Sequence, residues 1–357
     1  MNTLNQQVSE ALNSQCPALA VQMVAREFVR HPELEQRYGY AGREKCLEDA
    51  VYHLAYLAQA IAAGKTELFA DYIGWAKVML GKRGVPAEDL AGLFDTMKES
   101  LRQGLPPELS RLACDYLDSG LRQLPLLPED VPCFIVEGTP LASLATQYLQ
   151  ALLRGERHAA SKLILDTVQQ GTSVRDVYLH LFQRTQYEIG RLWQVNQISV
   201  AQEHYCTAAT QLIMSQLYPC IFGAEKTHGT LVATCVSGDL HEIGARMVSD
   251  FFEMEGWHTY YLGANVPTPS VVQTLIGHQA AVLAISATIT YHVRAFEALI
   301  AAVRRAPECR GVKILVGGYP FKIASDLWRD IGADGSAPDA QEAVLLGDRL
   351  SSQSFSA

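Results

Sequence analysis

The chain has 357 residues and a formal net charge of −9, with 48% hydrophobic and 19% charged residues. This composition is typical of a globular protein and excludes a disordered or fibrous one, and the length indicates two or three domains. No apolar run approaches the roughly 18 residues of a membrane-spanning helix. The first residues lack the basic region and apolar core of a secretory signal, so we expect a cytoplasmic protein without membrane contact.

The eight cysteines and the charge distribution exclude several other classes. No two cysteines form a CxxC pair, so neither a zinc site nor a secreted disulfide framework is expected. Acidic residues exceed basic ones along the whole chain, and no segment is a basic domain. Because binding to phosphate backbones needs a cationic surface, we expect no direct nucleic-acid binding.

The N-terminal third is predicted to be entirely helical. Apolar residues recur with helical spacing at 47–63, 68–80 and 89–101, and a last helix covers about 108–123. Prolines 125, 128, 132 and 140 then mark a loop. We therefore predict a helical sensor domain at 1–125 and a proline-rich linker at 126–140.

Residues 141–225 are predicted to form a four-helix bundle. The helical segments are expected at about 141–154, 157–170, 173–195 and 199–218, with Ser199 as a helix cap.

From residue 229 the period changes, and strand and helix alternate five times. Continuous apolar strands between helices indicate a doubly wound parallel sheet of five strands, a Rossmann-like domain at 226–357. The predicted fold class is thus α plus α/β, with the ligand at the C-terminal ends of the strands.

The loop after the first strand carries the most informative motif, Ser237-Gly238-Asp239-Leu240-His241-Glu242-Ile243-Gly244. Asp239 can accept a hydrogen bond from one ring nitrogen of His241, which would leave the other nitrogen as a metal ligand. The alternative is that Asp239 only caps the next helix and that His241 is an exposed residue of its first turn.

This DxHxxG pattern resembles the cobalamin-binding domain of methionine synthase and methylmalonyl-CoA mutase. Three more segments match that family in order: Tyr261–Pro267, Ser286–Thr288 and Gly317-Gly318. The resemblance implies that His241 is the lower cobalt ligand, that Asp239 orients it, and that the nucleotide tail lies beside the sheet. The cofactor-binding residues it implies are Ser237, Gly238, Asp239, Leu240, Glu242, Ile243, Gly244, Leu262, Gly263, Val266, Ser286, Thr288, Gly317, Gly318 and Tyr319.

A second pattern lies in the predicted bundle, where Trp193 is followed after nine residues by Glu203-His204. An indole, a carboxylate and an imidazole suit a lid over a nucleoside, although a core tryptophan with a surface Glu-His pair is the alternative. The pattern resembles the cap of CarH-type photoreceptors. This implies adenosylcobalamin, photolysis of its cobalt–carbon bond and a light-dependent homo-oligomer. Gln194 stands where those proteins have the histidine that binds cobalt after photolysis.

The helical domain resembles the corresponding domain of photocobilins over residues 53–86. Those proteins pair cobalamin with a bilin, so the resemblance implies biliverdin or another bilin as a second chromophore. Tyr52, His53, Tyr72 and Trp75 are candidates to line the bilin slot, and a plain helical core containing a satisfied His53 is the alternative.

The main functional hypothesis is a light sensor without catalytic residues, in which loss of the adenosyl group moves the cap. Its signal is expected to pass through a downstream partner, which the sequence does not identify, or through its oligomeric state. The first alternative is a corrinoid methyl carrier of a methyltransferase system. The second is a module that senses cobalamin without light.

Overall fold

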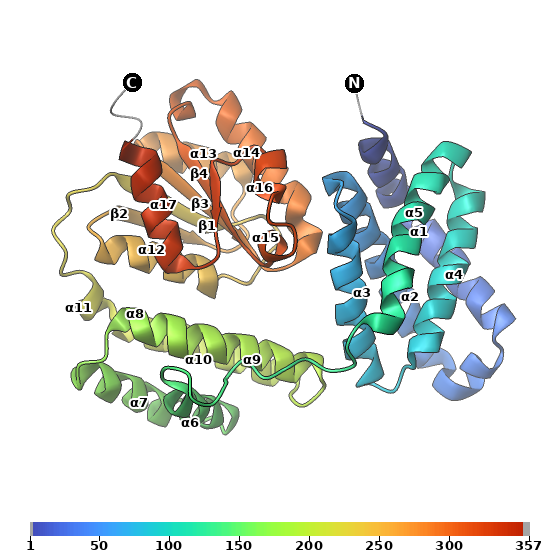
Figure 1. The fold of residues 1–357 in the computed structure, drawn as a ribbon, viewed down its shortest axis with the longest axis horizontal. Coiled ribbons are helices and arrows are strands. Elements are labelled where there is room, and N and C mark those ends of the chain that lie inside the picture. Colours follow the sequence, from blue (N-terminus) through green and yellow to red (C-terminus); the bar gives the residue numbers. More distant parts are fainter. Residues whose placement is uncertain (1–2, 353–357) are drawn as a thin grey trace. The chain divides into compact units, whose positions relative to one another are not determined.

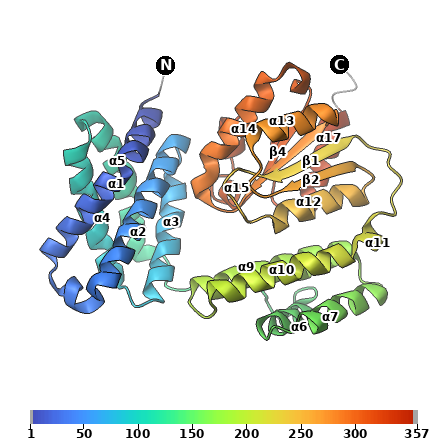
Figure 2. The same cartoon turned by 180° about the vertical axis from the view of Figure 1, so that it is seen from behind.

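The computed structural model describes residues 3–352, which divide into two compact units (Figures 1 and 2). The first contains the described residues up to Glu129 with segments 289–294 and 323–327, and the second contains the rest. No helix among the described residues is long and apolar enough to cross a membrane.

The N-terminal part of the first unit is all helical, as predicted. Its helices are α1 (Leu4–Arg30), α2 (Glu33–Ala63), α3 (Thr66–Gly81), α4 (Ala87–Gly104) and α5 (Pro107–Gln123), followed by the 3-10 turn η1 (Leu124–Leu126). Helix α2 is broken at Gly39, whose φ of 62° lies in the left-handed region.

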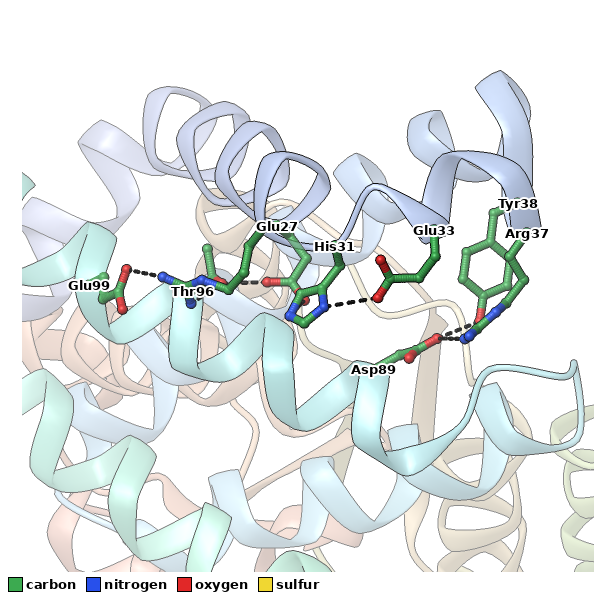
Figure 3. Close-up of polar contacts among 9 residues, drawn as sticks. Glu27, His31, Glu33, Arg37, Tyr38, Asp89, Thr96 and Glu99 are labelled. Atoms are coloured by element: carbon green, nitrogen blue, oxygen red, sulfur yellow. Dashed lines mark hydrogen bonds and ion pairs between the residues drawn. The ribbon is translucent and has the colours of Figure 1, made fainter.

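Polar side chains connect α1 and the start of α2 to α4 (Figure 3). The Thr96 hydroxyl donates to the buried Glu27 carboxylate, and Arg30 contacts Glu99 at 2.7 Å. At the other end, Tyr38 donates to Asp89 at 2.7 Å, as does Arg37 (Figure 3). These contacts fix how the first helices pack on α4.

The second unit begins with the helical bundle. Its helices are α6 (Ala142–Leu153), α7 (Arg157–Gln169), α8 (Val174–Asp176), the π-helical η2 (Val177–Phe182), α9 (Gln183–Gln194), α10 (Val200–Gln216) and α11 (Tyr218–Ile221). Because α8, η2 and α9 are continuous, they form the single helix that was predicted at 173–195. Ser199 caps α10 as expected, in a capping box with Gln202.

The rest of the second unit is the predicted parallel five-stranded sheet. The strands are β1 (Thr230–Cys235), β2 (His258–Gly263), β3 (Val282–Ala287), β4 (Lys313–Gly318) and β5 (Gly335–Ala337), in the spatial order β2-β1-β3-β4-β5. Figures 1 and 2 show α12 (Ile243–Met254) and α17 (Ala340–Ser352) on one face. On the other face lie α13 (Thr268–Gly277) and α14 (Val293–Arg305).

The remaining short elements are η3 (Thr290–His292), which belongs to the first unit, and then η4 (Pro307–Cys309), α15 (Tyr319–Ile323) and α16 (Leu327–Asp330). The last two are separate short helices. Helix α12 begins only at Ile243, because residues 237–242 remain a loop. β2 is not a continuously buried strand, since it forms the edge of the sheet.

One hydrophobic cluster joins the bundle to the sheet domain. It contains Tyr148, Tyr178 and Phe182 from the bundle together with Phe251 and Trp257 from the sheet domain. The bundle is therefore packed directly on the α12 face of the sheet.

Candidate functional site

The loop between β1 and α12 lies where the strand order reverses, between β2 and β3. In doubly wound sheets this switch point is where ligands bind. Gly238 has a φ of 89°, and its N–H donates to Asn265 Oδ1 at 2.9 Å. The loop is thus anchored to the segment that follows β2.

Asp239 and His241 form the pair that the motif predicted. The two residues interact through His241 Nδ1 and Asp239 Oδ1, 2.7 Å apart. Asp239 is completely buried, and its other oxygen accepts the Thr288 backbone N–H at 2.6 Å. The His241 side chain is 53% exposed. With Nδ1–H donating to the carboxylate, Nε2 keeps its lone pair for a metal.

The electrostatics of this pair favour a fixed imidazole. Burial alone would raise the pKa of Asp239, but hydrogen bonds from His241 and from the Thr288 backbone outweigh it and lower that pKa. The hydrogen bond to Asp239 raises the pKa of His241, and the charge of Glu203 on α10 adds to this effect. Glu203 of the bundle therefore lies within electrostatic range of His241.

A cavity lies between the sheet and helices α12 and α17, and α9 of the bundle also contributes to its lining. Four predicted residues line it: Gly244, Ser286, Gly317 and Gly318. The sequence motifs missed the other lining residues, among them Gln183, Tyr187, Val248, Ala284, Lys322 and Asp339. Of these, Gln183 and Tyr187 lie on one face of α9, because they are four residues apart. The sequence shows this spacing, but it does not show that this face of the helix lines a cavity.

The absence of a side chain has a different structural consequence at Gly244 than at Gly318. At Gly244 an added Cβ would meet no atom within 4 Å, so the structure leaves open space there for a bulky group. At Gly318, with a φ of 103°, an added Cβ would collide with the Ala287 carbonyl at 1.9 Å. The packing of β4 on β3 therefore already requires Gly318, whatever binds beside it.

The predicted lid residues are only partly brought together. Trp193 is half-buried and packs against the bundle core, and Glu203 accepts from the Thr207 hydroxyl at 2.9 Å. His204 is 76% exposed and lies 3.4 Å from Glu203. Gln194, which stands where CarH-type photoreceptors have a histidine, is buried.

The remaining predicted cobalamin contacts differ in their exposure. Ser237, Gly238 and Leu240 are exposed, whereas Ile243 and Gly263 are buried. Leu262, Val266 and Glu242 are half-buried, and Tyr319 is exposed at the end of β4.

In the helical domain, His53 and Tyr72 are buried together. His53 Nδ1 lies 2.8 Å from Tyr72 Oη, and Trp75 stacks on Tyr72. His53 Nε2 is buried without a hydrogen-bond partner, and burial lowers the pKa of His53 to about 3. Tyr52 is 58% exposed, because successive helix residues point in different directions.

These residues fit a corrinoid, a cobalt ion already held by a macrocycle. Such a metal needs only one ligand from the protein, and His241 presents one oriented imidazole. Near it lie the open space at Gly244 and the cavity that Gly244 lines. The fold and site together define a corrinoid-binding module made of a helical cap and a Rossmann-like domain.

Comparisons with known proteins agree with this class. Two B12 binding domain families match residues 144–218 and 229–345. Dimethylamine corrinoid protein 2 of Methanosarcina acetivorans is 30% identical over 168 residues, which are 46% of this chain and 74% of that protein. Dimethylamine corrinoid protein 3 of the same organism is 34% identical over 36% of this chain and 59% of its own length. The chain belongs to the cobalamin-binding corrinoid proteins.

A solved structure shows the same fold. The monomethylamine corrinoid protein of Methanosarcina barkeri superposes with a TM-score of 0.52 at 22% identity, over 57% of this chain and 96% of that one. The chain spans slightly less than three fifths of the length of the first curated relatives it matches. Residues 3–124 match a different family, described as phycobilisome protein.

Proposed function

We propose that His241 binds the lower face of the cobalt of a corrinoid and that α9 and α10 cover the upper face. The observation that carries this proposal is the 2.7 Å contact between Asp239 and His241 at the switch point of the sheet. The bound corrinoid would supply a cobalt centre able to hold and release a carbon group. The protein would orient the imidazole and exclude water from that centre.

The relatives favour the corrinoid methyl carrier as the function of residues 144–345. Each relative named above is a methylamine corrinoid protein, and the two B12 binding matches lie in this range. In this function the chain would carry a methyl group between partner proteins and would not be an enzyme by itself.

A second candidate, the light sensor, is favoured by the fused N-terminal domain. The phycobilisome protein match covers residues 3–124, the segment for which a bilin was predicted. In this function adenosylcobalamin would lie under Trp193, Glu203 and His204, and a bilin would occupy the helical domain near His53, Tyr72 and Trp75. Photolysis would remove the adenosyl group and change the oligomeric state, and a partner would read that change.

One experiment separates the two functions. Full-length protein is loaded with methylcobalamin or adenosylcobalamin, with and without biliverdin, and its absorption spectrum is recorded before and after green light. Conversion of the adenosyl form faster than that of the free cofactor, together with a new red band, supports the light sensor. An adenosyl form no more light-sensitive than the free cofactor, without any change of oligomer, supports the methyl carrier.

His241→Ala tests the part that both functions share. The variant is expected to lose the spectrum of nitrogen-ligated cobalt while keeping its fold by circular dichroism. An unchanged cobalamin spectrum and affinity would remove His241 from the metal site.

Trp193→Ala tests the lid. Unchanged adenosylcobalamin binding and photochemistry in this variant would contradict the assignment of Trp193 to the lid.

A further inference from the structure

We propose that Glu242 is a positioning residue that couples the cap helix α10 to the cobalt ligand His241. The inference rests on the proposed ligation by His241. It concerns how the protein controls that ligand, and it assigns Gln211 as the partner on the cap.

The Glu242 carboxylate is held from three sides. Oε1 accepts from Gln211 Nε2 of α10 at 2.8 Å. Oε2 accepts from the Ala264 backbone N–H at 3.0 Å and from the Tyr261 hydroxyl at 3.1 Å. The first contact comes from the cap and the other two from the end of β2, so one carboxylate joins both parts of the cobalamin unit.

The surroundings of Glu242 leave little freedom for this carboxylate. An added Cβ at Gly263, whose φ is 79°, would lie 3.0 Å from Glu242 Oε2. A side chain there would therefore push the carboxylate away from Ala264. The absence of a side chain at Gly263 therefore leaves room for the Glu242 carboxylate at the end of β2.

The cap side of this contact belongs to a row of polar residues on α10. Glu203, Thr207, Gln211 and Ser215 recur every four residues, which places them on one helix face. Arg246 of α12 donates to the Gln211 carbonyl at 3.0 Å and to the Ser215 hydroxyl at 2.8 Å. The same face begins at Glu203, whose charge acts on His241.

Glu242 controls His241 because the two residues are consecutive at the start of α12. The Glu242 backbone carbonyl accepts the Arg246 N–H at 3.0 Å, so the residue also belongs to the first helical turn. When α10 leaves, the carboxylate loses the Gln211 amide and its remaining partners lie on β2 alone. The loop that holds the imidazole then loses its support from the cap, and dissociation of His241 from cobalt becomes easier.

The coupling must act in both directions. If cap contact strengthens His241 ligation, then ligation strengthens cap contact by the same factor. Loss of one hydrogen bond to a charged group changes such an equilibrium by about tenfold. We expect the cap and the lower ligand to respond together to any change at the upper face.

A swap of donor and acceptor tests the proposal. In Gln211→Glu two carboxylates would face each other, so the contact is lost. In the double variant Gln211→Glu with Glu242→Gln, the amide at 242 can donate to the carboxylate at 211 while its oxygen still accepts from Ala264. Ser215→Ala is the matched control, because it removes another cap contact without touching Glu242.

The readout is the fraction of cobalt bound to His241 in full-length protein loaded with cobalamin. This fraction is measured from nitrogen hyperfine splitting in the electron paramagnetic resonance spectrum of the cobalt(II) form, and from the absorption spectrum. We expect Gln211→Glu to increase the His-dissociated to His-bound ratio about tenfold, and the double variant to restore it. Ser215→Ala should stay within about twofold of the parent, since it leaves this charged contact intact.

Equal ratios in Gln211→Glu and the parent would overturn the coupling, as would a double variant that is no better than the single one. Circular dichroism and thermal unfolding of each variant identify a loss of fold, which the double variant is expected not to share. His241→Ala is measured in the same series. If it leaves the parent spectrum unchanged, the proposed ligation itself fails, and this result is distinct from failure of the coupling.

Discussion

At the scale of single residues, the site depends on one buried carboxylate. Asp239 accepts from the His241 ring, from the His241 backbone N–H and from the Thr288 N–H. It is completely buried, so its position does not depend on solvent. The DxH spacing predicted the pair, but the contact with Thr288 required the fold, because Thr288 follows a different strand.

Asp239→Asn is expected to weaken cobalt ligation by His241. The amide is a poorer acceptor than a carboxylate, so the imidazole becomes a weaker ligand, and loss of such a partner lowers metal affinity about 10- to 100-fold. The measurement is the His-bound cobalt fraction in the electron paramagnetic resonance spectrum. Asp166→Asn, on the exposed surface of α7, is the control, and equal ligation in both variants would contradict the role of Asp239.

A second buried carboxylate predicts a pH dependence of stability. Burial raises the pKa of Asp250 from 3.8 to about 6, although the Tyr178 hydroxyl donates to it at 2.8 Å. The folded protein therefore binds this proton more tightly than the unfolded chain does. The stabilisation of the folded state by this bound proton is complete below about pH 4 and is lost as the pH rises through about 6.

Asp250→Asn should remove this dependence, because the amide cannot ionise and still offers an oxygen to Tyr178. The free energy of unfolding of the variant, relative to the parent, should rise by ~3 kcal/mol between the acid and neutral limits, at 1.36 kcal/mol per pKa unit. Urea unfolding of both proteins from about pH 3 to pH 8 measures this difference, because the acid limit lies below the unfolded pKa of 3.8. A constant difference across the range would show that Asp250 does not titrate as stated.

At the scale of elements, helix α10 carries several of the candidate site residues. Its capping box joins Ser199 and Gln202 just before Glu203 and His204. The same helix carries Gln211 and contacts Arg246 further along. The sequence predicted this helix and its cap, but it did not predict which helix face meets the sheet domain.

Ser199→Ala should loosen the first turn of α10 and cost about 1 kcal/mol of stability, the usual effect of losing such a cap. Amide hydrogen exchange should accelerate at residues 200–204. Ser173→Ala, which removes the cap of α8, is the matched control. It should lower stability without accelerating exchange at 200–204, and faster exchange there in both variants would contradict a local effect.

At the scale of the whole molecule, the chain combines a corrinoid unit with a helical domain that matches another family. If light is the signal, the adenosyl form should stabilise one cap position and illumination should release it. Light scattering of the full-length adenosylcobalamin-loaded protein is expected to report a different molar mass after green light. Protein loaded with methylcobalamin and kept in the dark is the control.

An unchanged mass after complete photolysis would contradict the light-dependent oligomer. It would favour the methyl carrier, whose function depends on partner proteins. A mass that follows cobalamin occupancy alone would favour a sensor of the cofactor itself.

The sequence alone determined the element types, the parallel sheet and the Asp239–His241 pair. These features depend on local periodicity, on turn residues and on short spacings, which are all visible in a single chain. Only the tertiary structure decided that Glu242 meets Gln211, that Tyr187 and Lys322 line the cavity, and that Tyr178 reaches Asp250. Each of these contacts joins segments far apart in the sequence, and their distance depends on how the cap packs on the sheet rather than on any local pattern.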